Sequence, residues 1–307
     1  MTDTYEIYAI RYGHHPRKAA DNFIGGDPHD IEMPLDYFVW AIVGKSRTIL
    51  VDTGFDEAVG TRRGRQTVKA VPEGLKAIGI DPAAVETIIV SHLHYDHSGH
   101  YDLFPRARYH LQDREMEYAT GRAMCHHQIR NSFEADYVVA MVRKVFAGRV
   151  EFHDGDELIA PGVTVHRIGG HTKGLQSVRV ETRRGPVVIA ADAAHLYAHL
   201  DTGRVFPTVY NVARCSRGTD VCASSLRHRA TSCRAMIRWC SRAIRRPSPA
   251  LKAGLCDLMR SRRFDEPIRP FASIPSASRA VLSIVAWETA PLVGRRISAG
   301  GCERGFD

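Results

Sequence analysis

Four histidines and an aspartate lie within the ten residues SHLHYDHSGH at 91–100. His92, His94, Asp96 and His97 form an HxHxDH pattern directly after the apolar run IIV, so we expect them in a loop at the end of a buried strand. Imidazole nitrogens and carboxylate oxygens suit zinc and similar divalent ions. The alternative is a polar surface loop with chance histidines, which the ordered spacing and the following Ser-Gly disfavour. The segment predicts a metal site.

Two further segments place donor side chains in the same setting. GGHTKG puts His171 in a glycine-rich turn after the predicted strand TVHRI, and VVIAADAAH puts Asp192 and His195 at the end of another buried strand. Either segment alone is more typical of an ordinary turn or cap. Three strand-end donor segments in one chain support one shared site.

The segments HLHYDH, GGHTKGLQ and ADAAH, with DTGF at 52–55, resemble the metallo-β-lactamase superfamily, and within it the N-acyl-homoserine lactonase-like group. MPLDYFVWAIVGKSRTILVDTGF at 33–55 adds to this resemblance, which covers about residues 5–213. It implies an α+β fold, a metallo-β-lactamase-type αβ/βα four-layer sandwich.

The resemblance also implies a ligand set for two zinc ions. His92, His94 and His171 would hold one, Asp96 and His97 the second, and Asp192 would bridge them. Asp52 would orient the site, as outer carboxylates do for ligating histidines. In the family pattern a tyrosine three residues after the bridging aspartate helps to hold the lactone. Here His195 takes that place and Tyr197 follows two residues later, so we expect Asp96, His195 and Tyr197 to take the catalytic roles.

The implied activity is opening of a lactone ring, with N-acyl-homoserine lactone as the expected, quorum-quenching substrate. A metal-bridging hydroxide would attack the carbonyl, one zinc would polarise that carbonyl, and the other would stabilise the leaving alkoxide. Asp96 is the expected proton carrier to the leaving group. A different lactone, a thioester, a β-lactam or a phosphodiester is an alternative substrate.

The elements that must position these residues alternate between strand and helix from 5 to 213. Strands are predicted at 5–13, 37–44, 48–52, 85–92, 107–113, 150–158, 162–168 and 176–192, and helices at 72–80 and within 114–147. Hairpin-like pairs such as SVRVETRRGPVVIA favour antiparallel or mixed sheets, so we expect two sheets with helices outside. The segment MPLDYF at 33–38 is a candidate lining of the lactone pocket.

Charge and cysteine content change near residue 213. Residues 214–307 hold 17 Arg, one Lys and seven acidic residues, a net charge of +11, whereas residues 1–213 carry −3. Six of the seven cysteines also follow residue 213, without paired CxxC motifs or a recognisable secretory signal. We predict a C-terminally incomplete hydrolase domain over 1–213 and an Arg/Cys-rich, poorly ordered tail of non-family sequence over 214–307.

The implied second zinc site lacks one ligand in this sequence. The family pattern needs a further histidine in a PGHDP-like turn some tens of residues after the bridging aspartate. After 213 the single histidine is His228, and its surroundings SLRHRAT do not resemble that turn. An inactive product that lacks the last metal ligand is therefore an alternative.

Our hypothesis for the missing turn is a shift of reading frame after about Val212. Regrouping the codons one base earlier forces Asp from Met236 and Ile237, and Val from Trp239 and Cys240. With suitable synonymous bases the stretch becomes PGHDPLVL. We interpret the tail as out of frame. The competing interpretation, a basic arm for nucleic acid or anionic lipid, is disfavoured because the tail lacks interleaved aromatic residues.

No segment reaches the roughly 18 apolar residues that span a membrane, and MTDTYEIYAI lacks the features of a secretory signal. We expect a cytoplasmic protein with a small-molecule lactone substrate, no membrane or nucleic-acid partner, and a homodimer as an open alternative. The histidine pairs at 14–15 and 126–127 are predicted to be solvated, because the ligand set is filled elsewhere.

Overall fold

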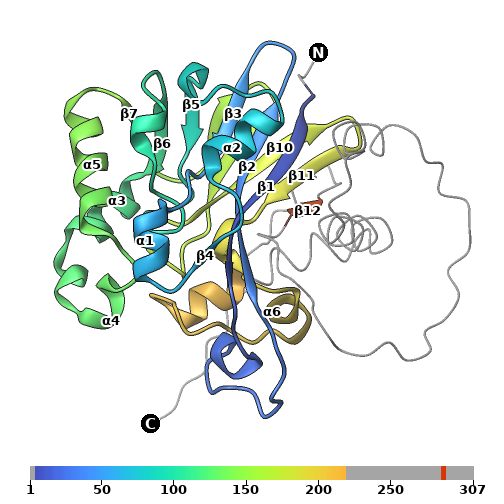
Figure 1. The fold of residues 1–307 in the computed structure, drawn as a ribbon, viewed down its shortest axis with the longest axis vertical. Helices are drawn as coiled ribbons and strands as arrows, with labels where there is room; N and C mark the ends of the chain where they lie inside the picture. Colours follow the sequence, from blue (N-terminus) through green and yellow to red (C-terminus); the bar gives the residue numbers. More distant parts are fainter. Residues whose placement is uncertain (1–3, 219–284, 288–307) are drawn as a thin grey trace, which may run out of the picture.

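Two β-sheets pack face to face in the computed structural model, which describes residues 4–218 and 285–287 (Figure 1). The seven-stranded sheet has the order β4-β1-β2-β3-β5-β6-β7. Its strands are β1 (Glu6–His15), β2 (Leu35–Val43), β3 (Thr48–Val51), β4 (Gln66–Thr67), β5 (Thr87–Ile89), β6 (Arg108–Gln112) and β7 (Val150–His153). The five-stranded sheet has the order β12-β11-β10-β9-β8. It consists of β8 (Glu157–Ala160), β9 (Val163–Arg167), β10 (Gln176–Thr182), β11 (Gly185–Ile189) and β12 (Val285–Trp287).

The first sheet is mixed and the second is antiparallel. β3, β5, β6 and β7 pair in parallel, whereas β1, β2 and β3 pair antiparallel. The expectation of antiparallel or mixed sheets is therefore confirmed. Since parallel strands end at the same edge of a sheet, the loops after β3 and β5 emerge side by side, and these loops carry Asp52 and His92.

Helices connect the strands and cover the outer face of the first sheet (Figure 1). The α-helices are α1 (Glu57–Arg62), α2 (Val71–Ala77), α3 (Asp113–Thr120), α4 (His127–Arg130), α5 (Ala135–Phe146) and α6 (Tyr197–Thr202). Short 3-10 turns are η1 (Ala19–Asn22), η2 (Pro82–Ala84), η3 (Tyr101–Leu103), η4 (Arg122–Cys125) and η5 (Ala191–Ala193). The helical stretch predicted within 114–147 is thus divided among α3, η4, α4 and α5.

The central part of strand β2 is apolar at every position because both of its faces are buried. Successive side chains of a strand point to opposite faces. Trp40 and Ile42 face the core between the sheets, where they join Val165 and Val178 from the second sheet. Val39 and Ala41 face the helices on the other side. A strand buried on both faces loses the polar alternation of a surface strand.

The expected α+β class with two sheets and outer helices is confirmed. No helix within the described residues is long and apolar enough to cross a membrane. Residues 212–218 are helical, and Cys215 packs with Val205 and Phe206. Of the predicted tail over 214–307, the structure describes residues 214–218 and 285–287, while the predicted missing turn and His228 lie outside the described residues. The boundary at 213 stays a prediction.

Candidate metal centre

The loop that follows β5 carries the first donor group. Val90 and Ser91 lead directly from the strand into the HxHxDH segment, where His92, His94 and His97 are all buried. Hydrogen bonds from Thr53 N to His97 O and from Gly99 N to Gly54 O tie this loop to the loop after β3. The loop is therefore held against the end of the sheet.

The turn between β9 and β10 carries His171. Gly169 and Gly170 have φ angles of 67° and 95°, a region that favours glycine. A Cβ atom at Gly170 would lie 2.5 Å from the backbone nitrogen of Cys215, so the close approach of this segment also needs a residue without a side chain. Nδ1 of His171 donates to the carbonyl oxygen of Thr208 at 2.6 Å. The hydrogen bond leaves Nε2 as the nitrogen with a free lone pair.

Asp192 lies in η5, directly after β11, and connects the two histidine groups. Its Oδ2 is 3.2 Å from Nε2 of His171 and 3.8 Å from Nε2 of His92. Its Oδ1 is 3.4 Å from Nε2 of His97. The preceding Ala191 has φ 48°, a left-handed conformation that is unusual for alanine. The Asp192 carboxylate thus directs Oδ2 toward His92 and His171 and Oδ1 toward His97.

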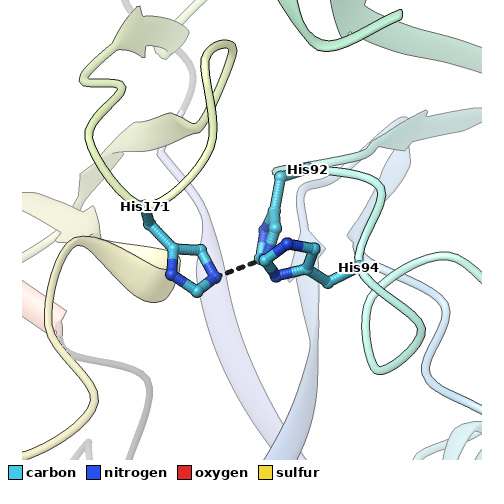
Figure 2. A group of neighbouring side chains, drawn as sticks. All are labelled: His92, His94 and His171. Carbon is cyan, nitrogen blue, oxygen red and sulfur yellow. Dashed lines mark hydrogen bonds between the residues drawn. The ribbon is translucent and has the colours of Figure 1, made fainter. Parts of the chain in front are cut away.

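The imidazole rings of His92, His94 and His171 converge from two separate loops (Figure 2). One donor atom from each lies within 4.8 Å of the others, and Nε2 of His92 is 3.1 Å from Nε2 of His171. Two further groups with the same spacing share these residues: His92 with His97 and Asp192, and His171 with Asp192 and His195. The three groups form one continuous cluster of nitrogen and oxygen donors.

Asp52 holds His97 from behind. Its Oδ2 accepts from Nδ1 of His97 at 2.7 Å, and its carboxylate also accepts from the backbone N–H and the hydroxyl of Ser91. Nε2 of His97 is left to face Asp192 and Oδ2 of Asp96, which is 3.6 Å away. The positioning role implied for Asp52 is thus supported by its contacts.

Burial and neighbouring charges divide the histidines into two electrostatic types. Burial, with the surrounding imidazoles, lowers the pKa of His92 and His94 well below the ordinary value. Burial alone would also lower the pKa of His97, but Asp192, Asp52 and Asp96 together raise it well above that value. Burial raises the pKa of Asp96. A neutral imidazole is the form that binds a metal, so His92 and His94 are already in the ligating state.

The donor set fits zinc. Ligand bonds of about 2.0–2.1 Å in tetrahedral geometry place neighbouring donor atoms about 3.4 Å apart. The observed separations among His92, His171 and Asp192 run from 3.1 to 3.8 Å. Those from His97 to Asp192 and Asp96 are 3.4 and 3.6 Å. The cluster can therefore hold a metal ion with little movement of the side chains.

The two residues expected near the lactone differ in placement. Nε2 of His195 is 3.0 Å from Oδ2 of Asp192, and the ring stacks on Phe206 at a centroid distance of 3.7 Å. His195 lines the cavity beside the donor cluster. Tyr197, the first residue of α6, instead packs with Leu175 and Leu200 and does not line this cavity. The geometry therefore supports a substrate contact for His195 more strongly than for Tyr197.

The cavity has a volume of about 210 Å³. Leu35, Asp36, Tyr37 and Phe38 line it, as expected for the MPLDYF segment. The remaining lining residues are Tyr12, His15, Arg17, Arg63, Arg65, His94, Tyr95, Asp96, His97, Asn131, Ser132, His171, Asp192, Ala194, His195 and Thr208.

The prediction that both histidine pairs are solvated is only half right. His126 and His127 are exposed. Nδ1 of His14, however, lies 2.7 Å from the buried Asp36 carboxylate, and His15 lines the cavity, where burial lowers its pKa to about 4. Tyr12 and His15 of β1 line the cavity, whereas His14 contacts Asp36. This arrangement is a tertiary feature that adjacent residue types do not reveal.

Glu115 is a buried residue that sequence patterns did not single out. Its carboxylate accepts from the backbone N–H of Leu93 at 2.9 Å and from that of Gly174 at 3.0 Å. It therefore joins the HxHxDH loop to the turn that carries His171. A lone glutamate at the start of a helix gives no local signal of such a bridge.

Comparison with known families supports a relationship over most of the described chain. The model of the metallo-beta-lactamase superfamily matches residues 33–233. The N-acyl homoserine lactonase AttM of Azorhizobium caulinodans is 34% identical over 137 residues, which cover 41% of this chain and 47% of that protein. An N-acyl homoserine lactonase of a Bacillus species is 29% identical over 178 residues, covering 52% of this chain and 66% of the relative. The chain thus spans about half to two thirds of these relatives.

Solved structures share the fold. An N-acyl homoserine lactone hydrolase with N-hexanoyl-L-homoserine at its catalytic metal centre aligns with a TM-score of 0.61 and 21% identity, covering 74% of this chain and 90% of that chain. AidC, a dizinc quorum-quenching lactonase, aligns with a TM-score of 0.54 and 16% identity, covering 71% and 85%. At these identities the likeness concerns the fold alone.

Proposed function

The chain belongs to the metallo-beta-lactamase superfamily, and we propose that it acts there as a zinc-dependent hydrolase of N-acyl-homoserine or related lactones. One observation carries this proposal: donor atoms from three strand-end loops converge at one side of a single cavity. A hydrolytic metal site needs both closely spaced ligands and room for a substrate beside them.

The proposed ligands follow the two spatial groups. His92, His94 and His171 would hold one zinc ion, Asp96 and His97 would hold the second, and Asp192, which lies between the two groups, would serve both. When bound, zinc supplies a water whose pKa is lowered to near neutrality and polarises the carbonyl to be attacked. The nearly complete burial of the three histidines in the first set keeps solvent from competing for the ligand atoms.

Asp96 and His195 act on the substrate itself. Asp96 lines the cavity, so its carboxylate would lie beside a bound lactone. It would take up the proton released by the attacking water and pass it to the ring oxygen as the ester bond breaks. His195 holds the lactone against the cluster, because its ring is fixed between Phe206 and Asp192.

Hydrolysis of N-hexanoyl-homoserine lactone by the purified, zinc-loaded protein tests the proposal. We expect release of one acid equivalent and formation of N-hexanoyl-homoserine, with a loss of at least about a hundredfold in kcat/KM for His94→Ala. The exposed His127→Ala is the matched control. Turnover of a thioester, a β-lactam or a phosphodiester without turnover of any lactone would contradict the substrate assignment.

A second candidate is an inactive product that lacks the last ligand of the second zinc, because the single histidine after residue 213, His228, lies in SLRHRAT, which does not resemble the family turn. Zinc analysis separates the two. Two zinc ions per chain would contradict a missing ligand, whereas one or none would support it. Assay beside a version with residues beyond 212 in the restored frame would then show whether that part completes the site.

A further inference from the structure

Three basic side chains share the cavity with the donor cluster. Arg17 follows β1, Arg65 precedes β4, and His15 ends β1, and all three line the same cavity as Asp96 and His195. Each is only partly exposed. A pocket for a neutral lactone has no need of two guanidinium groups, so their presence calls for a reason.

Asp21 and Asp96 act electrostatically on Arg17 and Arg65, respectively, but no described carboxylate lies within ion-pair distance of either arginine. Arg63, also at the cavity, forms an ion pair with Glu134 at 2.6 Å. The carboxylate of Asp36 already contacts Arg11 and His14, each at 2.7 Å. Neither Arg17 nor Arg65 forms an ion pair with a carboxylate in the described part of the chain.

Hydrogen bonds fix Nε and Nη1 of Arg65 and leave Nη2 available to a ligand. Its Nε donates to the hydroxyl of Tyr95 at 2.8 Å, and its Nη1 donates to Nε2 of His15 at 3.0 Å and to the carbonyl oxygen of Arg63 at 2.6 Å. Its Nη2 has no hydrogen-bond partner within residues 4–218. A guanidinium group fixed in this way is preorganised, so little conformational entropy is lost when a ligand binds.

His15 contacts Arg65 at the same place. Burial, followed by the charges of Arg65 and Arg17, lowers its pKa to about 4, so the ring is neutral near pH 7. Because Nε2 accepts from Arg65, the ring proton lies on Nδ1. Nδ1 is buried and has no hydrogen-bond partner among the described residues. At the cavity, His15 therefore acts through Nε2, which accepts from Nη1 of Arg65 and helps to fix that guanidinium group.

We infer that the cavity accepts a lactone that carries an anionic group, a carboxylate or a phosphate, and that Arg17 and Arg65 bind this group. The inference rests on the lactonase proposal and names the substrate class of that site. Guanidinium groups bind carboxylates and phosphates through paired, charge-assisted hydrogen bonds. The anionic end would lie at the arginines, and the ring would face Asp96, His97 and Asp192.

A matched set of lactones tests the inference: γ-butyrolactone-γ-carboxylate, its methyl ester, and the analogue with a phosphooxymethyl group. We expect kcat/KM to be at least about tenfold higher for one of the anionic lactones than for the ester, chiefly through KM. Preference for the carboxylate or the phosphate identifies the anion. In Arg65→Gln and, separately, Arg17→Gln, this preference should fall about tenfold. Arg62→Gln is the matched control, because Arg62 is exposed and lies outside the cavity lining.

Binding of a compound without an ester separates failure of this inference from failure of the lactonase proposal. Pyroglutamate, the lactam counterpart of the carboxylated lactone, and its neutral amide are titrated calorimetrically into the zinc-loaded protein. Preferential binding of pyroglutamate that Arg65→Gln abolishes, without hydrolysis of any lactone, would support the anion site and reject the lactonase. Hydrolysis that favours the neutral ester, with arginine variants unchanged in their preference, would reject the anion site and leave the lactonase standing.

Discussion

Asp52 Oδ2 and His97 Nδ1 lie 2.7 Å apart, and this contact joins the end of β3 to the loop after β5. Asp52 has φ 65°, a left-handed conformation that directs its carboxylate toward Ser91 and His97. The hydrogen bond sets the tautomer of His97 and directs Nε2 into the donor cluster. Orientation of His97 within the donor cluster therefore depends on Asp52, which is not itself part of that cluster.

Asp52→Asn replaces an accepting oxygen with an amide that donates on one side. We expect the affinity for the second zinc ion to fall about 10- to 100-fold, because His97 loses its orientation. Titration of zinc against a competing chelator measures this loss. Asp102→Asn, at an exposed aspartate, should leave the affinity unchanged. A change of less than twofold in Asp52→Asn would show that the contact does not orient the ligand.

His171→Ala should remove the gain in stability that zinc confers. A ligand that binds the folded state alone stabilises it according to its concentration and affinity. We expect added zinc to raise the melting temperature of the parent protein by several degrees, and chelation to reverse the rise. The variant should show a smaller zinc-dependent shift, while exposed His126→Ala retains the full shift. Equal shifts in all three proteins would place the zinc elsewhere.

Glu115→Ala should loosen both metal loops at once. It leaves the N–H groups of Leu93 and Gly174 without their acceptor, and each buried donor costs about 1–3 kcal/mol. We expect the free energy of unfolding to fall by roughly 2–5 kcal/mol in urea titrations. Glu115→Gln, which keeps one acceptor oxygen, should lose less. Exposed Glu117→Ala serves for comparison; an equal effect there would argue against the bridging role.

Titration of the buried His110 should make the free energy of unfolding depend on pH, independently of catalysis. Burial lowers its pKa to about 4, and Nδ1 lies 3.0 Å from Nε2 of His153. Between pH 6.5 and 4 the unfolded chain binds a proton at this position that the folded chain does not. Stability is therefore lost as the pH falls through this range, by roughly 3 kcal/mol in the limit.

Urea unfolding of the parent protein and of His110→Phe at several pH values between 4 and 7 measures this contribution. The variant lacks the titrating group but keeps a planar ring that can stack on His153. We expect a shallower fall of stability on acidification than in the parent. His127→Phe, at an exposed position, should follow the parent. Parallel curves for His110→Phe and the parent would contradict the assigned cause.

Much of the fold followed from local patterns. The apolar runs of β2 and β5 and the hairpin of β10 and β11 were visible because side-chain alternation and turn residues act over a few neighbours. The division of residues 114–147 into several short helices could not be predicted from the sequence. The breaks between these helices depend on packing around Phe133 and on the loop near Asn131. Helix propensity is too weak to locate such breaks.

The donor residues and their places after strands can be read from the sequence, because residue type and local periodicity depend on consecutive positions. Which of these donors lie together depends on the folding of the whole chain. His92 and His171 are 79 residues apart and Arg65 and His15 are 50 apart, yet each pair is in hydrogen-bond contact. Glu115 and the arginines of the cavity had no local signature. Contacts between residues far apart in the sequence arise from sheet pairing and loop packing, and the residues next to them along the chain do not indicate such contacts.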